Sequence, residues 1–395
     1  MKRNDHIFIF VLFCCIIICM MSLPAAAHAD SFDSAKAAIV TDPRTGTVLY
    51  AHDEHKRMPM ASTTKIMTAL IALESGDLDE PFTVDSGAVH TEGSSMGLCE
   101  GDTVTMRDLV CGMLLPSGND AANAAAVRIS GSVPAFVEKM NERAAQMGLK
   151  DTHFVTPSGL DDYTDDHYST AFDMAKLAAE ALKNPGFAAI CSQQSVTVSF
   201  GSPPYERQLF NSNKLLGMCD GVIGVKTGFT DKAGRCLVSA CERDGAELIC
   251  VTLGDRNDWH DHSALYERCF ARMVSVSLEG SGKEYDIPLA GGETVSMTAV
   301  AAPVSLKLPD TAVKDITAKV SLDRIAFAPV KTGERVGAVK YFCGSRLIYE
   351  LPITAAEDAQ AKRFDKSEWK KLMRSVDDML GSGDDKQQRL MPHSY

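Results

Sequence analysis

The chain has 395 residues, a formal net charge of −12 at pH 7, 45% hydrophobic residues and 23% charged residues. This composition excludes an intrinsically disordered chain, and the acidic balance excludes the basic surface of a nucleic-acid-binding protein. The length is typical of two or three domains.

The first 29 residues have the pattern of a secretory signal peptide. Lys2 and Arg3 precede an apolar stretch at 7–23, and an Ala-His-Ala sequence ends at Ala29, which predicts cleavage before Asp30. We therefore expect export across the cytoplasmic membrane to the cell envelope. An uncleaved membrane anchor is the alternative, because the apolar stretch is close to the shortest that spans a bilayer.

Residues 30–281 mix helical and strand patterns, which predicts one large α+β or α/β domain. Turn residues between two β-rich runs indicate a hairpin, and apolar residues at helical spacing indicate five helices. The expected elements are a hairpin over 37–50, helices over 63–74, 106–115, 120–129, 133–147 and 170–182, and strands over 236–240 and 247–253.

The character of the chain changes after Gly282. Residues 282–356 hold short β-rich runs separated by Gly and Pro turns, which predicts a small all-β domain. Residues 357–395 form a tail in which Phe364, Trp369 and Leu380 belong to an apolar series at helical spacing. This amphipathic tail suits a membrane surface. Packing against the β domain explains the pattern equally well.

Cysteine counts favour free thiols over a disulfide framework. Three of the twelve cysteines lie in the predicted leader, so nine remain, and none forms a C-x-x-C pair. Cys236, Cys241 and Cys250 sit in apolar strand-like runs, where a thiol behaves as a small hydrophobic group. We expect buried thiols, with at most a few bridged pairs.

Ser62 and Lys65 open the apolar helical run with the pattern S-x-x-K. Residues three apart on a helix share a face, so the Lys65 amine can lie beside the Ser62 hydroxyl. A serine needs a base to become a nucleophile, and lysine is a base only when burial or nearby positive charge lowers its pKa. Alone, the pattern also describes a helix start with a capping serine and an exposed lysine.

Two further motifs follow in the chain. Ser117-Gly118-Asn119 comes before an alanine-rich helix and can present a hydroxyl and a carboxamide together, although the same residues are common in turns. Lys226-Thr227-Gly228 offers an ammonium and a hydroxyl to a carboxylate, and its glycine allows close approach of another chain.

The three motifs in this order resemble the set shared by penicillin-binding proteins and serine β-lactamases. The chain is similar to the low-molecular-mass penicillin-binding proteins that act as D-alanyl-D-alanine carboxypeptidases, serine peptidase family S11. The resemblance covers about residues 34–355 and includes four longer stretches, at 59–68, 114–123, 167–171 and 225–234. It implies the transpeptidase fold, a sheet flanked by helices, followed by the small β domain.

The resemblance also implies roles for the site residues. Ser62 is the acylated nucleophile and Lys65 the general base, while Ser117 passes a proton to the departing D-alanine. The remaining implied roles concern the substrate: Asn119 binds its backbone, Lys226, Thr227 and Gly228 form the carboxylate site, and the backbone N–H groups of Ser62 and Phe229 form the oxyanion hole.

The implied substrate is the D-Ala-D-Ala end of the peptidoglycan pentapeptide, with β-lactams as covalent inhibitors and no cofactor or metal. A β-lactamase, a D,D-endopeptidase and a silent peptidoglycan-binding envelope protein are the alternatives. No glutamate stands out as the deacylating base of a class A β-lactamase. A catalytically silent protein is disfavoured because the whole set is intact: Ser62, Lys65, Ser117, Asn119 and Lys226.

Two other motifs are assigned no role in catalysis. Lys331-Thr332-Gly333 repeats the K-T-G letters, but it lies in the β-rich segment and is expected in an exposed turn. His260 and His262 have the spacing of metal ligands, yet no third ligand is suggested, so we expect them in a surface loop.

Overall fold

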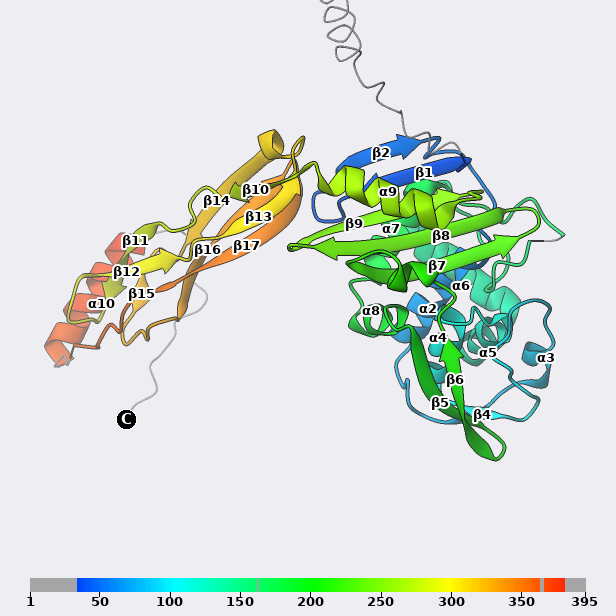
Figure 1. The fold of residues 1–395 in the computed structure, drawn as a ribbon. Helices are drawn as coiled ribbons and strands as arrows, with labels where there is room; N and C mark the ends of the chain where they lie inside the picture. The colour runs from blue at the N-terminus through cyan, green and yellow to red at the C-terminus, as the bar shows by residue number, and fades with distance from the viewer. Residues whose placement is uncertain (1–33, 162, 363–365, 381–395) are drawn as a thin grey trace, which may run out of the picture.

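The computed structural model describes residues 34–161, 163–362 and 366–380. The predicted signal peptide at 1–29 and the end of the tail at 381–395 lie outside the described residues. Figure 1 shows a larger unit with a central sheet and helices beside a smaller unit made mainly of strands. In the described part of the chain, no helix combines the length and the apolar character that a membrane crossing requires.

The central sheet has five antiparallel strands in the order β2-β1-β9-β8-β7 (Figure 1). The β1–β2 pair is the predicted hairpin, and β8 and β9 confirm the two other predicted strands. The strands of the central sheet are β1 (Ala37–Thr41), β2 (Val48–His52), β7 (Val222–Thr230), β8 (Gly234–Arg243) and β9 (Ala246–Leu253).

Both faces of this sheet are buried. Neighbouring residues on a strand point to opposite faces, and on β1 both sets of side chains pack into a core. Val40 packs with Leu265 in the cluster beneath α9 (Asp258–Phe270). Ile39 faces the other way, into the main core with Leu70 of α2 (Lys65–Glu74). The sheet therefore lies between α9 and a larger group of helices, and strand β7 is left as an edge.

The predicted helices are present, most of them beginning with a side-chain cap. Thr105, Ser132 and Thr170 each accept a hydrogen bond from a backbone N–H three residues later. The remaining helices of this unit are α3 (Ser86–Val89), α4 (Met106–Leu114), α5 (Asn119–Ser130), α6 (Val133–Gln146), α7 (Ala171–Ala181), α8 (Pro185–Cys191) and η2 (Lys214–Gly217).

The region expected as one helix over 63–74 is divided. A 3₁₀ turn, η1 (Ala61–Thr64), precedes α2, so Ser62 lies in the tighter turn and Lys65 begins the α-helix. A second sheet was not predicted: β3 (Phe82–Thr83), β4 (Thr103–Val104), β5 (Ser195–Gly201) and β6 (Pro204–Phe210) pair in that order. Buried and exposed side chains alternate along only part of β5, so the alternation of apolar and polar residues that predicts a strand is weak there.

The second unit is all β up to Ala355, as expected. A six-stranded sheet has the order β14-β16-β17-β12-β11-β15, and β10 pairs with β13 beside it (Figure 1). Its own core includes Ile287, Val339, Tyr341 and Ile353. The elements are β10 (Met273–Ser277), β11 (Glu284–Ala290), β12 (Ser296–Ala301), β13 (Ser305–Pro309), η3 (Val313–Asp315), β14 (Ile316–Leu322), β15 (Ala326–Phe327), β16 (Arg335–Cys343) and β17 (Arg346–Ala355).

The tail contains the expected helix, α10 (Lys366–Leu380). Val376 is buried, and Leu372 lies close to Gly291 of the β domain. Trp369 and Met373 are each 46% exposed. One side of the helix therefore packs on the β domain while two large apolar side chains remain accessible to solvent.

The cysteines of the described residues follow the prediction. All nine are free thiols, and seven of them are buried. Burial raises the pKa of Cys236 to about 12, so this thiol is neutral and packs as an apolar side chain.

Candidate active site

Ser62 and Lys65 meet at the junction of η1 and α2. The Lys65 Nζ lies 2.8 Å from the Ser62 Oγ, a hydrogen-bond distance that the three-residue spacing makes possible. Ser62 is partly exposed, whereas Lys65 is fully buried. The hydroxyl is thus open to a substrate, and the amine approaches it from the protein interior.

Two oxygen atoms from other segments hold the Lys65 amine in place. The Nζ donates to Asn119 Oδ1 at 2.6 Å and to the backbone carbonyl of Ser158 at 2.7 Å. A neutral amine has two N–H donors and one lone pair. With both N–H groups directed at these acceptors, the lone pair is left for the Ser62 hydroxyl.

Burial and a second lysine both favour the neutral form of Lys65. Desolvation holds the pKa of Lys65 well below its usual range, and the charge on Lys226 lowers it further. Burial also lowers the pKa of Lys226, to about 7. The site therefore contains an amine suited to act as a base and a second cation close enough to influence it.

The S-G-N motif ends the loop after α4 and begins α5, with Gly118 at the N-cap and Asn119 as the first helical residue. Ser117 has a backbone φ of 69°, in the left-handed region that serine rarely adopts. The Asn119 amide bridges two segments, since its Oδ1 accepts from Lys65 and its Nδ2 donates to the carbonyl of Glu92. Ser117 is 7% exposed and lies two residues before this amide.

Asp120 is a buried residue that the motif analysis did not select. Its carboxylate accepts hydrogen bonds from the backbone N–H groups of Met96, Gly97 and Leu98. It thereby ties the loop that follows α3 to the start of α5, beside Asn119. Asp120 directly follows the motif, but only the fold shows what its carboxylate binds.

Lys226 and Thr227 lie on the edge strand β7. Lys226 is 1% exposed, and its Nζ donates to the Thr227 carbonyl at 2.9 Å. The Thr227 hydroxyl lies 3.2 Å from that of Ser212, which also donates to the Leu115 carbonyl at 2.9 Å. Ser212 thus connects the K-T-G strand with the end of α4. The sequence carries no motif that identifies this serine.

Gly228 brings β7 against the nucleophile turn. A Cβ added at Gly228 would lie 3.1 Å from each of the Met60 carbonyl oxygen, the Ser62 nitrogen and the Thr63 nitrogen. Phe229, the next residue, is 63% exposed. The backbone N–H groups named for the oxyanion hole therefore belong to two segments in close contact.

The segment at 156–170 supports the same turn from the other side, which sequence reasoning did not predict. The Val155 N–H donates to His167 Nδ1, so His167 Nε2 carries the proton and donates to Thr64 Oγ1 at 2.8 Å. The Thr64 hydroxyl then donates to the Ala61 carbonyl at 2.8 Å. Burial lowers the pKa of His167 to about 3, so the ring is neutral.

The two motifs set aside earlier lie elsewhere. Lys331-Thr332-Gly333 forms an exposed turn in which the Thr332 hydroxyl donates to Asp358, as expected. The expectation for the histidines was wrong in part: both lie on α9 rather than in a loop, and only His260 is exposed at the surface. His262 is fully buried, and its ring nitrogens bond to Ser239 and Thr252.

Family models and curated relatives match most of this chain. The Peptidase S11 family model, described as D-alanyl-D-alanine carboxypeptidase, matches residues 24–257. A second model, for the penicillin-binding protein 5 C-terminal domain, matches residues 279–361. The carboxypeptidase DacF of Bacillus subtilis is 31% identical over 359 residues, covering 84% of this chain and 87% of DacF. DacB2 of Mycobacterium tuberculosis is 36% identical over 261 residues, covering 65% of this chain and 89% of DacB2.

Solved structures show the same fold. Penicillin-binding protein 5 of Haemophilus influenzae is 29% identical with a TM-score of 0.59, covering 83% of this chain and 98% of its own. DacD of Francisella tularensis is 27% identical with a TM-score of 0.59, covering 86% and 96%. These likenesses confirm the predicted transpeptidase fold with a β domain, and they do not favour the β-lactamase, endopeptidase or silent alternatives. The chain belongs to the D-alanyl-D-alanine carboxypeptidases, the serine peptidase family S11.

Proposed function

We propose that this protein hydrolyses the terminal D-Ala-D-Ala bond of peptidoglycan pentapeptide through an acyl-enzyme on Ser62. The observation that carries the proposal is the 2.8 Å contact between Ser62 Oγ and the buried Lys65 amine. A neutral lysine can remove the hydroxyl proton as the oxygen attacks. Family membership supports the reaction type, and the contact between Ser62 and Lys65 supports the roles proposed for these two residues.

Acylation follows from the positions of the groups. Ser62 Oγ attacks the carbonyl carbon between the two D-alanines, and its proton passes to Lys65. The carbonyl oxygen becomes an oxyanion that the N–H groups of Ser62 and Phe229 stabilise, an effect that is typically about 10²–10³-fold per donor. When the C–N bond breaks, Ser117 passes its proton to the leaving amine and takes the proton held by Lys65 in exchange, and free D-alanine departs.

Substrate recognition uses the rest of the site. Lys226 and the Thr227 hydroxyl bind the free carboxylate of the terminal D-alanine, and Asn119 binds the backbone of the stem. Gly228 keeps β7 close to the Ser62 turn, because a Cβ at this position would lie 3.1 Å from three backbone atoms of that turn. Water then attacks the ester on Ser62, which releases the shortened peptide and restores the hydroxyl. A β-lactam offers a similar carboxylate and a reactive amide, so it acylates Ser62 as an inhibitor.

Two assays test this function together. Fluorescent penicillin labels the wild-type protein, and Ser62→Ala abolishes the label. Wild type releases D-alanine from a D-Ala-D-Ala peptide, and Ser62→Ala loses at least about 10³-fold of this activity. Ser86→Ala, an exposed serine at the start of α3, is the matched control and keeps both properties. Labelling that persists in Ser62→Ala removes this serine from the mechanism.

The proposed organisation includes export and a membrane-facing tail. We assign 1–29 to a signal peptide, 30–281 to the peptidase domain, 282–356 to the β domain and 357–395 to the tail, with two adjustments at the boundaries. The strand β10 pairs with β13, and Ala359 packs in the β-domain core, so both belong to the β domain. Support for membrane contact comes from α10, where Trp369 and Met373 are exposed beside basic residues. Such a helix binds anionic lipid through apolar contact and charge together.

Vesicle sedimentation tests the tail. The mature protein cosediments with vesicles that contain anionic phospholipid. A double variant that carries both Trp369→Ser and Met373→Ser reduces the bound fraction severalfold. Val320→Ser is the control, since Val320 is equally exposed at 50% but lies on β14. Equal binding by the double variant and the control rules out α10 as the membrane contact. Intact mass of the exported protein reports cleavage before Asp30.

A further inference from the structure

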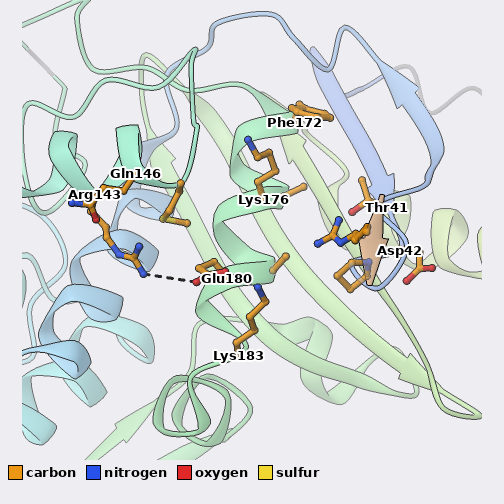
Figure 2. Close-up of a pocket in the computed structure, with 14 residues that line it drawn as sticks. Thr41, Asp42, Arg143, Gln146, Phe172, Lys176, Glu180 and Lys183 are labelled. Carbon is orange, nitrogen blue, oxygen red and sulfur yellow. Dashed lines mark hydrogen bonds and ion pairs between the residues drawn. The ribbon is translucent and has the colours of Figure 1, made fainter. Parts of the chain in front are cut away.

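A hollow lies away from the nucleophile. It has a volume of about 450 Å³ and is lined by α6, α7, the turn between β1 and β2, and Arg346 at the start of β17 (Figure 2). In the central sheet, β1 and β2 form the edge opposite β7. This pocket is therefore separate from the carboxylate site on β7, and it is formed by both structural units.

Positive charge exceeds negative charge around the pocket. Its lining contains Arg143, Lys176, Lys183 and Arg346 against the two acidic residues Asp42 and Glu180. This local excess is opposite in sign to the net charge of −12 on the whole chain. A positively charged hollow on an acidic protein attracts an anion that the rest of the surface repels.

Two of the four cations are already neutralised. Arg143 pairs with Glu74 at 2.7 Å and lies 3.8 Å from Glu180, which also pairs with Lys183 at 2.7 Å. Figure 2 shows Arg143 directed at Glu180 of α7, and Lys183 lies in the turn just after this helix. The Asp42 carboxylate is used internally, because it accepts from the Thr45 hydroxyl and N–H.

Lys176 and Arg346 form no ion pair with a carboxylate of the described residues. The Lys176 ammonium donates to the Gly148 carbonyl at 2.6 Å and lies 5.8 Å from the Phe172 ring centre. An ammonium has three donors, so this bond leaves two. Figure 2 shows Lys176 and Phe172 on neighbouring turns of α7 at the pocket wall.

Arg346 reaches the pocket because of a glycine. A Cβ added at Gly46 would lie 2.6 Å from Arg346 Nη1, so the missing side chain leaves space for the guanidinium. Gly46 also has a φ of 78°, which favours glycine. The β domain thus places a cation against the β1–β2 turn of the peptidase unit.

The remaining lining is apolar. Phe172, Ala175 and Ala179 of α7 form one wall, with Pro43 and Met147 nearby. A volume of 300–1,000 Å³ with an apolar wall and a few charged groups is characteristic of sites for small organic ligands. The lining therefore suits a ligand that combines an anionic group with a short carbon skeleton.

We propose that this pocket binds an organic phosphate ester, with the phosphate between Lys176 and Arg346 and the polyol or sugar part against the Phe172 wall. A tetrahedral phosphate presents oxygens in several directions and so serves two cations from different segments, with bidentate pairing to the guanidinium. Because Lys176 belongs to α7 and Arg346 to β17, the bound ester joins the two units. The proposal is independent of the reaction at Ser62.

Calorimetric titration of the mature protein at constant ionic strength tests the site, since salt screens exposed charges. The probes are glycerol 1-phosphate, inorganic phosphate and glycerol. Glycerol 1-phosphate binds more tightly than inorganic phosphate, and glycerol does not bind. Arg346→Ala and Lys176→Gln each lower the affinity for glycerol 1-phosphate by about tenfold or more, which corresponds to one lost hydrogen bond to a charged group.

Arg324→Ala is the matched control, because Arg324 is an exposed arginine of the β domain outside the pocket. It leaves the affinity within twofold of wild type. Penicillin labelling and the melting temperature show that each variant is folded, and labelling is unchanged in all three. Equal affinity for inorganic phosphate overturns the ester assignment. Absence of phosphate binding, or binding that both pocket variants retain, overturns the site.

Discussion

Gly228 on β7 lies directly against the backbone of Ser62. A Cβ at position 228 would be 3.1 Å from the Ser62 nitrogen, closer than most side chains approach a backbone atom. The strand that carries Lys226 and Thr227 therefore touches the turn that carries the nucleophile. The proposed carboxylate site and the Ser62 hydroxyl are therefore held at a fixed separation by backbone contact.

Gly228→Ala is expected to slow acylation. The added methyl meets three backbone atoms that cannot move independently, so β7 and the nucleophile turn separate and the oxyanion donors shift. We expect a loss of about 10²-fold in the second-order rate of penicillin labelling. Gly217→Ala is the control, because its Cβ meets only the Gln194 side chain at an ordinary 3.6 Å. Equal rates for both variants contradict the contact argument.

Lys65→Arg is expected to remove the base, because it replaces a neutral amine with a permanent cation. A guanidinium stays protonated in proteins, so it cannot accept the Ser62 proton. The rate of acylation falls by about 10²–10⁴-fold, the usual contribution of a general base. Stopped-flow labelling with fluorescent penicillin measures this rate. Lys56→Arg, on the exposed surface, retains the wild-type value, and near-normal acylation in Lys65→Arg means that another group is the base.

The pH dependence of catalysis should reveal Lys226. Burial lowers its pKa to about 7, so the free enzyme loses this cation as pH rises through 7. We expect kcat/KM for a D-Ala-D-Ala peptide to decline on the alkaline side, because this parameter reports the free enzyme. Lys226→Arg has a lower rate, but its decline moves above pH 10, since arginine keeps its charge. An alkaline limb that is identical in both proteins excludes Lys226 as its cause.

Gly159→Ala should destabilise the fold at the active site. Gly159 has a φ of 89°, and an added Cβ would overlap the Ala61 carbonyl oxygen. Gly76→Ala is a close control, because Gly76 has a φ of 78° and no atom within 4 Å of the added Cβ. Both variants incur the cost of the left-handed backbone, about 1–2 kcal/mol. Thermal unfolding should show the larger loss for Gly159→Ala, and equal losses contradict the overlap.

His262 should make the protein sensitive to acid. Burial lowers its pKa to about 3, whereas an unfolded histidine has a pKa of about 6.5. Between these values the unfolded chain binds the extra proton, so stability falls as pH falls below 6.5, by about 1.4 kcal/mol per unit. Denaturant unfolding at pH 7 and pH 5 measures the slope. His262→Gln lacks this contribution, and an unchanged slope in the variant refutes the assignment.

The sequence alone determined much of the chemistry. Ser62 and Lys65 are three residues apart, so any helical turn brings them together, and burial of the apolar run lowers the lysine pKa. The alternating and helical patterns likewise predicted the β1–β2 hairpin, helices such as α7 and the all-β character after Gly282. These are local signals, in which residues near in sequence decide the outcome.

The tertiary structure decided what depends on distant segments. Ser158 holds Lys65 through a backbone carbonyl, Ser212 connects Thr227 with α4, and His167 braces the nucleophile turn. A carbonyl has no sequence signature, and a single serine or histidine acquires a role only when the fold places a partner beside it. For the same reason His262 was expected at the surface but is buried under the sheet. Spacing predicts neighbours along one helix, whereas contacts between elements depend on how the elements pack.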